Sequence, residues 1–272
     1  MVDRKKLVIP GYGTMFTADR SATFPTNPLS AFGLSGTIPV GWERLGHTSK
    51  ANTAAFTREG GEAESLGTWL EDNVDTIYSS VAWALGINAL QIDKPTLDLS
   101  FGGFLDADGG YVIPSMNNGL EKQFFLLMQD NTGKLGFWSE NASITGGDAP
   151  SIDTANFFEM PLTASIRSAD SAKIPATDDG RAGIMKLYKT GLGLPLITAP
   201  TPASAAAAAT VQITGRNFTF ATEVKFGNDV ADHVVKSDTR IDAVVPAGAS
   251  GTANIRITND SGQSDAFTFA RS

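Results

Sequence analysis

Val211-Gln212-Ile213-Thr214-Gly215 alternates apolar and polar side chains with a period of two, the pattern of a β-strand with one buried face. Glu223-Val224-Lys225-Phe226-Gly227 repeats this pattern. Further short segments of the same kind are 233–235, 241–245, 253–257 and 266–269, with turn sequences such as Asn259-Asp260-Ser261-Gly262 between them. Six or seven strands at a spacing of about 8–12 residues predict a small β-sandwich.

The turn residues of this region follow a specific order. Ile213-Thr214-Gly215-Arg216-Asn217-Phe218 is followed by Val224-Lys225-Phe226-Gly227, by Ser237-Asp238-Thr239-Arg240-Ile241, by 245–251 and by 257–262. In content and order these motifs resemble the IPT/TIG type of immunoglobulin-like domain, over residues 206–272. The resemblance implies an immunoglobulin-like sandwich and is almost silent on function, since such sandwiches serve many purposes.

A segment rich in proline and alanine precedes the sandwich. Pro195, Pro200 and Pro202 are followed by Ala203-Ser204 and five alanines. Prolines lack a backbone donor and alanines have little to bury, so we expect residues 195–209 to be a linker. A short alanine helix is the alternative, but one turn without an apolar face is marginal in water. The expected domains are therefore 1–194 and 210–272.

Composition excludes several classes of site. The chain has 272 residues, 21 basic and 29 acidic side chains, and a net charge of −8. Residues 1–200 hold 15 of the basic and 22 of the acidic side chains, so nearly all the net charge lies before the linker. A pI near 4.8 argues against a groove that grips nucleic-acid phosphates. The absence of cysteine excludes disulfides, zinc–thiolate sites, iron–sulfur clusters and a cysteine nucleophile.

The sequence predicts no membrane insertion. No segment approaches the ~20 apolar residues of a membrane-spanning helix. Charged residues near the N-terminus are interrupted by Pro10-Gly11 before any apolar h-region, so we expect no signal peptide and first folding in a cytoplasm.

The first domain also reads as β-rich. Residues 79–92 place Val81, Trp83, Leu85, Ile87 and Ala89 on one parity, which predicts a long strand with one buried face. A short helix follows, with Asp93 as N-cap and Gly102-Gly103 at its end. Other strands are expected at 6–16, 52–58, 156–167 and 184–188, with a hairpin formed by 122–129 and 134–138. The predicted fold class is mostly β, a barrel or sandwich with one short helix, plus the C-terminal sandwich.

A second resemblance spans roughly residues 30–190. Residues 41–50, the acidic stretch after Phe56-Thr57-Arg58, the strand around Trp83-Ala84-Leu85 and the short helix near Thr96-Leu97-Asp98-Leu99 follow one another in order. This succession resembles the major tail tube proteins of long-tailed bacteriophages with non-contractile tails. A C-terminal immunoglobulin-like domain is common in that family, so the two resemblances support each other.

We interpret several short motifs as ordinary loops and turns rather than as functional sites. Residues 11–16 lack the third glycine and the Lys-Ser/Thr pair of a phosphate-binding loop, and read as a loop or bulge. Asp106-Ala107-Asp108-Gly109-Gly110 resembles the start of a calcium loop, but Asn117 stands where the glutamate belongs, so we expect a turn. His47 is conceivable as a general base, but no nucleophile elbow accompanies it; it reads as a loop histidine and His233 as structural. We expect no catalytic site, cofactor or metal.

The acidic stretch from Glu59 to Asp75 contains no basic residue. Its carboxylates are Glu59, Glu62, Glu64, Glu71, Asp72 and Asp75. Each alone reads as a solvated loop side chain. A carboxylate pair for glycoside hydrolysis lacks an aromatic substrate cleft. Together the six predict a surface that repels DNA, facing a lumen or a subunit interface.

The tail tube resemblance implies a structural virion protein. Subunits are expected to form hexameric rings that stack into a tube for genome delivery, with strand 79–92 and hairpin 122–138 as candidates to line the lumen. An acidic lumen would let DNA slide without specific binding. The expected partners are other copies, the tape measure protein in the lumen before ejection, and tail-end proteins, with assembly in the host cytoplasm and location in the virion tail.

The C-terminal sandwich is expected to decorate the outside of the tube and to bind host-surface glycans weakly, with repetition along the tail compensating for low affinity. The alternative is a bacterial surface or secreted glycan-binding adhesin, against which the missing signal peptide counts. An enzyme with an accessory sandwich has no set of residues to rest on.

Overall fold

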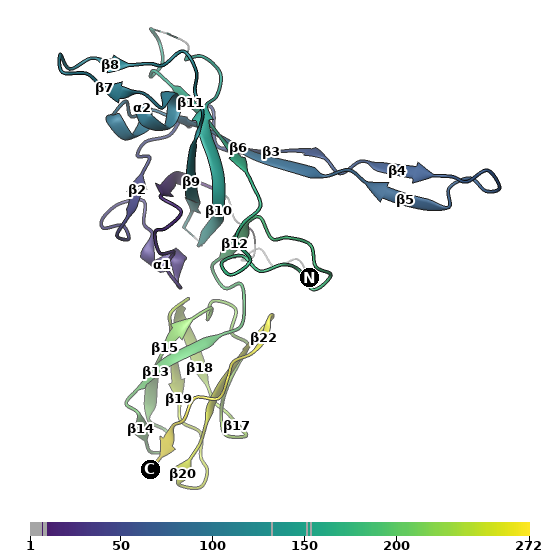
Figure 1. Ribbon diagram of the computed structural model, residues 1–272. Helices are drawn as coiled ribbons and strands as arrows, with labels where there is room; N and C mark the ends of the chain where they lie inside the picture. The colour runs from purple at the N-terminus through teal and green to yellow at the C-terminus, as the bar shows by residue number, and fades with distance from the viewer. Residues whose placement is uncertain (1–6, 8–9, 132, 151, 153) are drawn as a thin grey trace. The chain divides into compact units, whose positions relative to one another are not determined.

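The computed structural model describes residues 7, 10–131, 133–150, 152 and 154–272, and it divides into two compact units, residues 1–188 and 189–272. In both units the regular secondary structure consists almost entirely of strands (Figure 1). Among the described residues, no helix is long and apolar enough to cross a membrane. The start of the strand expected at residues 6–16 lies partly outside the described residues.

The first unit is organised around one large antiparallel sheet with the strand order β2-β1-β9-β10-β11-β6-β3, and β12 pairs with β10. Its elements are β1 (Tyr12–Ala18), α1 (Pro28–Ala31), β2 (Trp42–Arg44), β3 (Ala55–Gly60), β4 (Ala63–Leu66), β5 (Asp75–Tyr78), β6 (Val81–Ala89), α2 (Lys94–Phe101), β7 (Phe104–Leu105), β8 (Tyr111–Val112), β9 (Leu120–Gln129), β10 (Lys134–Gly146), β11 (Met160–Ile166) and β12 (Lys186–Lys189).

The segment after β2 joins the two ends of this sheet. Trp42 pairs with Ala18 of β1, and a few residues later Thr48 pairs with Ala89 of β6. The backbone N–H of Ser49 donates to the Asn88 carbonyl oxygen, and that of Leu90 donates to the His47 carbonyl oxygen. The sheet therefore curls back on itself like a barrel, which removes part of its exposed edge.

Two hydrophobic cores cover opposite faces of the sheet. Phe124 and Leu126 of β9 belong to one core, while Phe125 and Leu127 belong to the other. In the second core, Phe24 stacks on Trp138 with ring centroids 3.9 Å apart. Because both faces of β9 are covered, this strand has no face left for a lumen, and the expectation that hairpin 122–138 lines one is wrong for β9.

The short helix α2 has the ends that its sequence predicts. Asp93 Oδ1 accepts a hydrogen bond from the Thr96 backbone N–H at 3.0 Å, and Gly102 ends the helix in the left-handed conformation with φ +63°. The helix packs on β10 and β11 through Leu99. The structure adds α1, a single turn beginning at Pro28, which the sequence analysis missed.

The second unit is an immunoglobulin-like sandwich, as predicted. Its sheets have the strand orders β13-β15-β19-β18, β17-β16-β21-β22 and β14-β23-β20. The strands are β13 (Leu196–Thr201), β14 (Ser204–Ala205), β15 (Thr210–Arg216), β16 (Glu223–Phe226), β17 (Asp229–Val230), β18 (His233–Ser237), β19 (Arg240–Val244), β20 (Gly251–Thr252), β21 (Ile255–Asn259), β22 (Gly262–Gln263) and β23 (Ala270–Arg271). Their alternating apolar residues meet in one core around Phe218, Phe226 and Phe269.

The segment 195–209 is not a linker but part of this sandwich. β13 pairs with β15, and Ile197 and Ala205 are buried in the core. The Ala208 backbone N–H donates to the Val245 carbonyl oxygen at 2.9 Å. Prolines are tolerated here because β13 is an edge strand, where a missing donor costs no ladder hydrogen bond. The boundary between the units lies earlier, between Tyr188 and Lys189.

Candidate functional site

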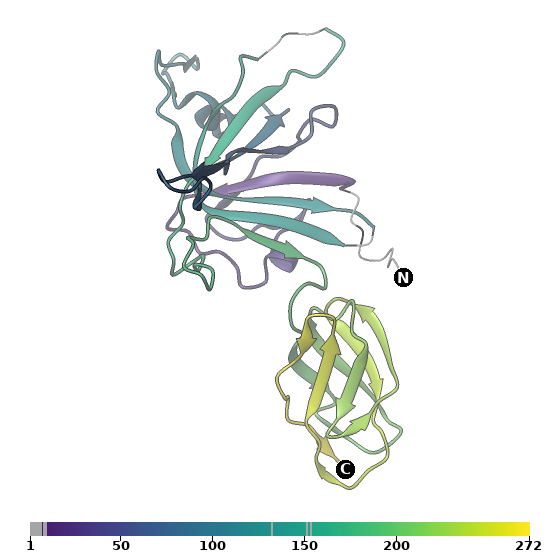
Figure 2. The ribbon, with the colours of Figure 1, turned by 90° about the vertical axis from the view of Figure 1, so that its right-hand side faces the viewer.

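A long β-hairpin leaves the large sheet as an arm, defined here as residues 55–86. In the half of the arm within the sheet, Ala55 pairs with Gly86 and Gly60 with Val81. In the half that extends beyond the sheet, Ala63 pairs with Tyr78 and Leu66 with Asp75. Both sets of pairs follow the same antiparallel register, so the hairpin continues from β3 and β6 into β4 and β5 without a register shift. Figure 1 shows the arm extending well beyond the sheet, and Figure 2 shows it nearly end-on. At about 3.3 Å per residue, the five steps from Gly61 to Leu66 alone span roughly 17 Å.

Two glycines mark the joint between the halves of the arm. Gly60 and Gly61 have φ values of +79° and +77°, in the left-handed region that favours glycine. Opposite them, Ser79 Oγ accepts hydrogen bonds from the backbone N–H groups of Gly61 and Glu62, at 2.9 and 3.1 Å. The Ser79 backbone N–H donates to the Glu62 carbonyl oxygen at 3.0 Å. The joint is therefore a fixed twist in the hairpin.

The tip of the arm presents two large apolar side chains to solvent. Trp69 is 105 % exposed and Leu70 is 99 % exposed. Thr68 holds their turn: its Oγ1 accepts from the backbone N–H groups of Leu70 and Glu71, and its own N–H donates to the Glu71 carbonyl oxygen at 2.7 Å. Tryptophan in a fixed, fully exposed position is typical of an anchor for a binding partner.

The base of the arm is tied to the body of the unit by one carboxylate. Glu159 accepts hydrogen bonds from Ser49 Oγ at 2.5 Å, Asn52 Nδ2 at 2.8 Å and Asn88 Nδ2 at 2.6 Å. The hydrogen bonds from Ser49, Asn88 and Asn52 lower the pKa of the Glu159 carboxyl. Asn52 precedes β3 and Asn88 lies in β6, so this carboxylate holds both strands where they enter the arm.

All six predicted site carboxylates lie on the arm and are exposed. Glu59 is in β3, Glu62 at the joint, Glu64 in β4, Asp75 in β5, and Glu71 and Asp72 at the tip. The solvated loop expected for the stretch is thus a hairpin. Within the described residues no cluster of three or more acidic, histidine or cysteine side chains could hold a metal ion.

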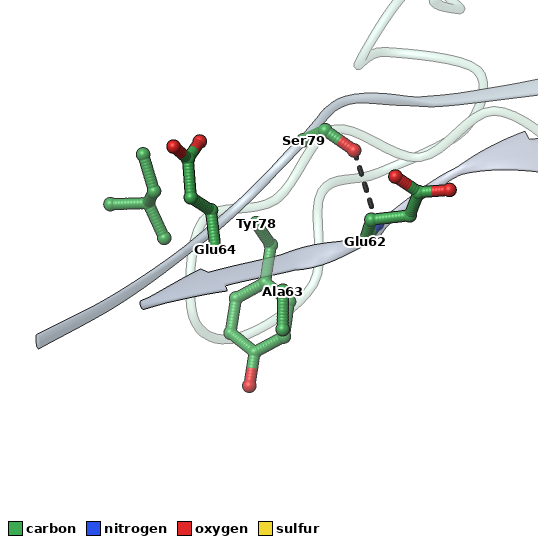
Figure 3. A pocket seen from close by; sticks show the side chains of 6 residues that line it. Glu62, Ala63, Glu64, Tyr78 and Ser79 are labelled. Atoms are coloured by element: carbon green, nitrogen blue, oxygen red, sulfur yellow. Dashed lines mark hydrogen bonds between the residues drawn. The ribbon is translucent and has the colours of Figure 1, made fainter. Parts of the chain in front are cut away.

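A shallow hollow on the arm does not form a ligand site. It is lined by Glu62, Ala63, Glu64, Ile77, Tyr78 and Ser79. Figure 3 shows Ala63 and Tyr78 on one side of the hairpin and Glu64 on the other. Ligand pockets need walls that enclose a ligand, which a single layer of two strands lacks.

The other candidate residues from the sequence lie in ordinary loops, turns and strands. His47 is exposed, and its backbone N–H donates to Gln91 Oε1. The His233 ring lies 3.3 Å from the Ala231 carbonyl oxygen. Asp106 and Asp108 form the predicted turn, between β7 and β8, where Asp108 Oδ1 accepts from the Gly110 N–H. Residues 12–16 belong to strand β1 rather than to a loop.

Sequence reasoning found the charges of the arm and missed its apolar side chains. The exposed ones are Leu66, Trp69, Leu70, Val74, Ile77, Tyr78 and Val81. The Trp69-Leu70 pair inside an acidic stretch was the available signal, since large apolar side chains are rare in a purely solvated loop.

A long hairpin with an exposed apolar tip is the kind of surface that binds another protein chain. Comparison with known families agrees with this reading: residues 2–177 match the family model described as phage tail tube protein. The chain belongs to this tail tube family. Residues 195–270 match the IPT/TIG domain model, which confirms the resemblance of the C-terminal sandwich to that domain.

Two curated relatives are named as major tail proteins. The major tail protein Gp23 of Mycobacterium phage D29 is 24 % identical over 156 residues, covering 55 % of this chain and 79 % of the relative. Gp23 of Mycobacterium phage L5 is 25 % identical over 124 residues, covering 45 % of this chain and 63 % of the relative. The tail tube protein described here is therefore a structural component of a phage tail.

The similarity to solved structures is too low to support a conclusion. A gamma-CGTase from an alkalophilic Bacillus clarkii has a TM-score of 0.28 at 17 % identity, covering 57 % of this chain and 25 % of that one. SGBP-B from a xyloglucan utilization locus in Bacteroides uniformis has a TM-score of 0.28 at 14 % identity, covering 51 % and 45 %. Scores this low bear on neither fold nor function.

Proposed function

We propose that this chain is the major tail tube subunit of its phage, and that copies form hexameric rings which stack into the conduit for genome delivery. The arm is the observation that carries this proposal. A two-stranded hairpin is marginally stable in water by itself, and every residue of β4 and β5 is exposed. An arm with this geometry gains its buried contacts from a neighbouring copy.

The arm also suits stacking rather than closed pairing. It is acidic and apolar, and it extends from β3 at one edge of the sheet. A contact between the arm of one copy and a different surface of the next is heterologous, and heterologous contacts generate rings or open filaments. The exposed apolar area at Trp69 and Leu70 supplies the driving force for such a contact.

Charge supports passage of DNA without retention. Residues 1–188 contain 14 basic and 22 acidic side chains, whereas residues 189–272 contain seven of each. The whole net charge thus belongs to the unit that would surround the genome. A negative wall repels phosphates within the Debye length of about 8 Å and offers no cationic groove to hold them. In this proposal the tape measure protein fills the lumen before ejection, and tail-end proteins close the tube.

The C-terminal sandwich is proposed to decorate the tube and to contact host-surface glycans weakly. Residues 189–272 contain neither Trp nor Tyr, so sugar contacts would use polar side chains rather than stacking on large exposed rings. The adhesin alternative loses its support, because residues 2–177 match the tail tube family.

Electron microscopy of the purified protein tests the proposal. The full chain and a chain ending at Tyr188 are concentrated under the same conditions and imaged by negative stain. We expect six-fold rings or tubes from both chains. Dispersed monomers from the full chain at all concentrations would refute the tube function, whereas tubes from the full chain alone would refute only the decorative role of the sandwich. Glycan-array binding by residues 189–272 tests the glycan contact, and no binding above background would remove it.

A further inference from the structure

We propose that the arm binds the N-terminal segment of a second copy, residues 4–9, as a third strand along the outer edge of β4. This inference deepens the proposed tube function by naming the partner of the arm. Apart from Leu7, residues 4–9 lie outside the described part of the structure, so the argument uses their sequence and the geometry of the arm.

The arm has a free edge that can accept a strand. β3 is the last strand of the large sheet, and β4 continues it in the same hairpin; among the described residues no strand pairs with the outer side of β4. Unpaired backbone groups along an edge are a template for another chain. Adding one strand turns the two-stranded β4–β5 hairpin into a three-stranded sheet, which is the smallest sheet expected to be stable with an apolar face.

Charge complementarity selects the occupant. The arm carries six carboxylates between Glu59 and Asp75 and no cation in that stretch, whereas residues 4–6 are Arg4-Lys5-Lys6. Most other cations described in the first unit already have partners. Arg20 and Lys173 pair with Glu140, Arg167 with Glu121, Lys122 with Asp19, Lys94 with Asp98 and Arg181 with Asp179. The N-terminal cations are therefore the best match to the arm in this chain.

The apolar parts match as well. Leu7-Val8-Ile9 follows the cations directly and has high β-propensity. On the arm, Leu66 and Ile77 lie on one face and Tyr78 lies on the other, all exposed. A strand laid along the outer edge of β4 would lie beside Leu66 and the carboxylate of Glu64, which share one face of the hairpin.

A different apolar surface is a weaker candidate for the partner. The β7–β8 hairpin exposes Phe104, Leu105 and Val112. Its turn carries Asp106 and Asp108, however, and like charges would oppose docking of the acidic arm. This surface therefore serves as the competing outcome in the test.

Cross-linking tests the pairing cleanly, because the chain contains no cysteine. The variants Val8→Cys and Ser65→Cys are purified separately, mixed, and treated with a short bismaleimide under assembly conditions. We expect a covalent dimer of the two variants, at least tenfold above the yield from Ser65→Cys mixed with Ala107→Cys in the β7–β8 turn. Equal yields from the two mixtures would overturn the proposal.

Two further measurements determine whether the contact forms between copies and whether it depends on charge. The double variant Val8→Cys/Ser65→Cys must cross-link into dimers and larger species; a cross-linked monomer whose yield is unchanged by dilution would mean that the segment pairs within its own chain, which contradicts the proposal. Dimer yield must also fall at least tenfold when Arg4, Lys5 and Lys6 are changed to Glu, or when Glu62 and Glu64 are changed to Lys, and recover when the two sets are mixed. A loss without recovery would overturn the proposal.

Failure of this inference is separable from failure of the tube function. Wild-type tubes together with normal tubes from a chain lacking residues 2–9 would refute the pairing and leave the tube function standing. Absence of tubes from the wild type would refute the tube function itself.

Discussion

Gly60 lies against the backbone of Ser80 so closely that a Cβ on Gly60 would stand 2.1 Å from the Ser80 carbonyl oxygen. This contact occurs where the arm leaves the large sheet and where Gly60 and Gly61 both have positive φ. The direction of the arm therefore depends on a backbone position that admits no side chain.

Gly60→Ala should misdirect the arm without unfolding the unit. The added Cβ clashes with backbone and occupies a φ of +79°, so the local ladder must shift. We expect loss of rings and tubes in electron microscopy, with a decrease in Tm of a few degrees. Gly180→Ala is the matched control, since Gly180 has φ +84° and an added Cβ there would meet no described atom within 4 Å. Normal assembly of Gly60→Ala would show that the joint is dispensable.

Trp69→Ser/Leu70→Ser should weaken assembly and leave folding intact. Both side chains are fully exposed, so the free energy of unfolding should change by less than about 0.5 kcal/mol per site. If the tip anchors a neighbour, the critical concentration for assembly in light scattering should rise at least tenfold. Val40→Ser, at a side chain 97 % exposed outside the arm, should leave it unchanged. An unchanged critical concentration in the tip variant would remove the tip from the interface.

Glu140→Gln should destabilise the first unit. Glu140 is buried in β10, and its carboxylate bonds Lys173 Nζ at 3.0 Å, Arg20 Nε at 3.2 Å and the Asp170 N–H at 3.2 Å. These contacts hold the loop after β11 against the segment after β1. The neutral amide leaves them incompletely matched, and we expect a loss of about 1–3 kcal/mol in urea unfolding. Glu43→Gln, at an exposed side chain, is the control.

The effect of Glu140→Gln should depend on pH. Burial raises the pKa of the Glu140 carboxyl, but the hydrogen bonds from Lys173 and Asp170 and the charges of Lys173 and Arg20 outweigh it, so the pKa is lowered from 4.5. A depressed pKa gives stability that is present above the unfolded value and is lost as pH falls through the folded value. The difference between wild type and variant should thus be constant near pH 7 and begin to shrink as the pH falls below 4.5. A difference that does not shrink on further acidification would contradict this origin.

The second unit should fold by itself from residue 189 and less well from residue 195. Asn259 Nδ2 donates to the Gly193 carbonyl oxygen at 2.8 Å, and Asn217 Nδ2 donates to the Leu194 carbonyl oxygen at 2.9 Å. Removing residues 189–194 leaves both amides without these partners, which should cost about 1–3 kcal/mol. Thermal unfolding by circular dichroism measures the difference between fragments 189–272 and 195–272. Equal Tm values would place the boundary after residue 194.

Local signals predicted the elements whose determinants are local. Asp93 and Gly102 bound α2 as their chemistry requires. Leu85, Ile87 and Ala89 of β6 are buried on one parity as predicted, whereas Val81 on the same parity is exposed and Trp83 is half-buried, because they lie in the arm. In β15 and β19 the alternation was readable because each strand buries one face only. The residues within each of these elements are therefore enough to predict it.

Elements decided by tertiary contacts were missed. Gln123–Leu127 of β9 are buried on both faces, so alternation could not show which face lines a core. Residues 195–209 looked like a linker because the pairing of Ala208 with Val245 is invisible in sequence. The outer strands of the arm, β4 and β5, have no buried residue, so they show no amphipathic period, and only their charges were legible.

The position of Trp69 and Leu70 in the assembled protein tests the central claim most directly. A helical reconstruction of the assembled full-length chain by cryo-electron microscopy resolves residues 66–75 of each copy. We predict that this tip lies buried against a neighbouring copy. A tube whose arms point into solvent, with Trp69 contacting no other subunit, would contradict the account.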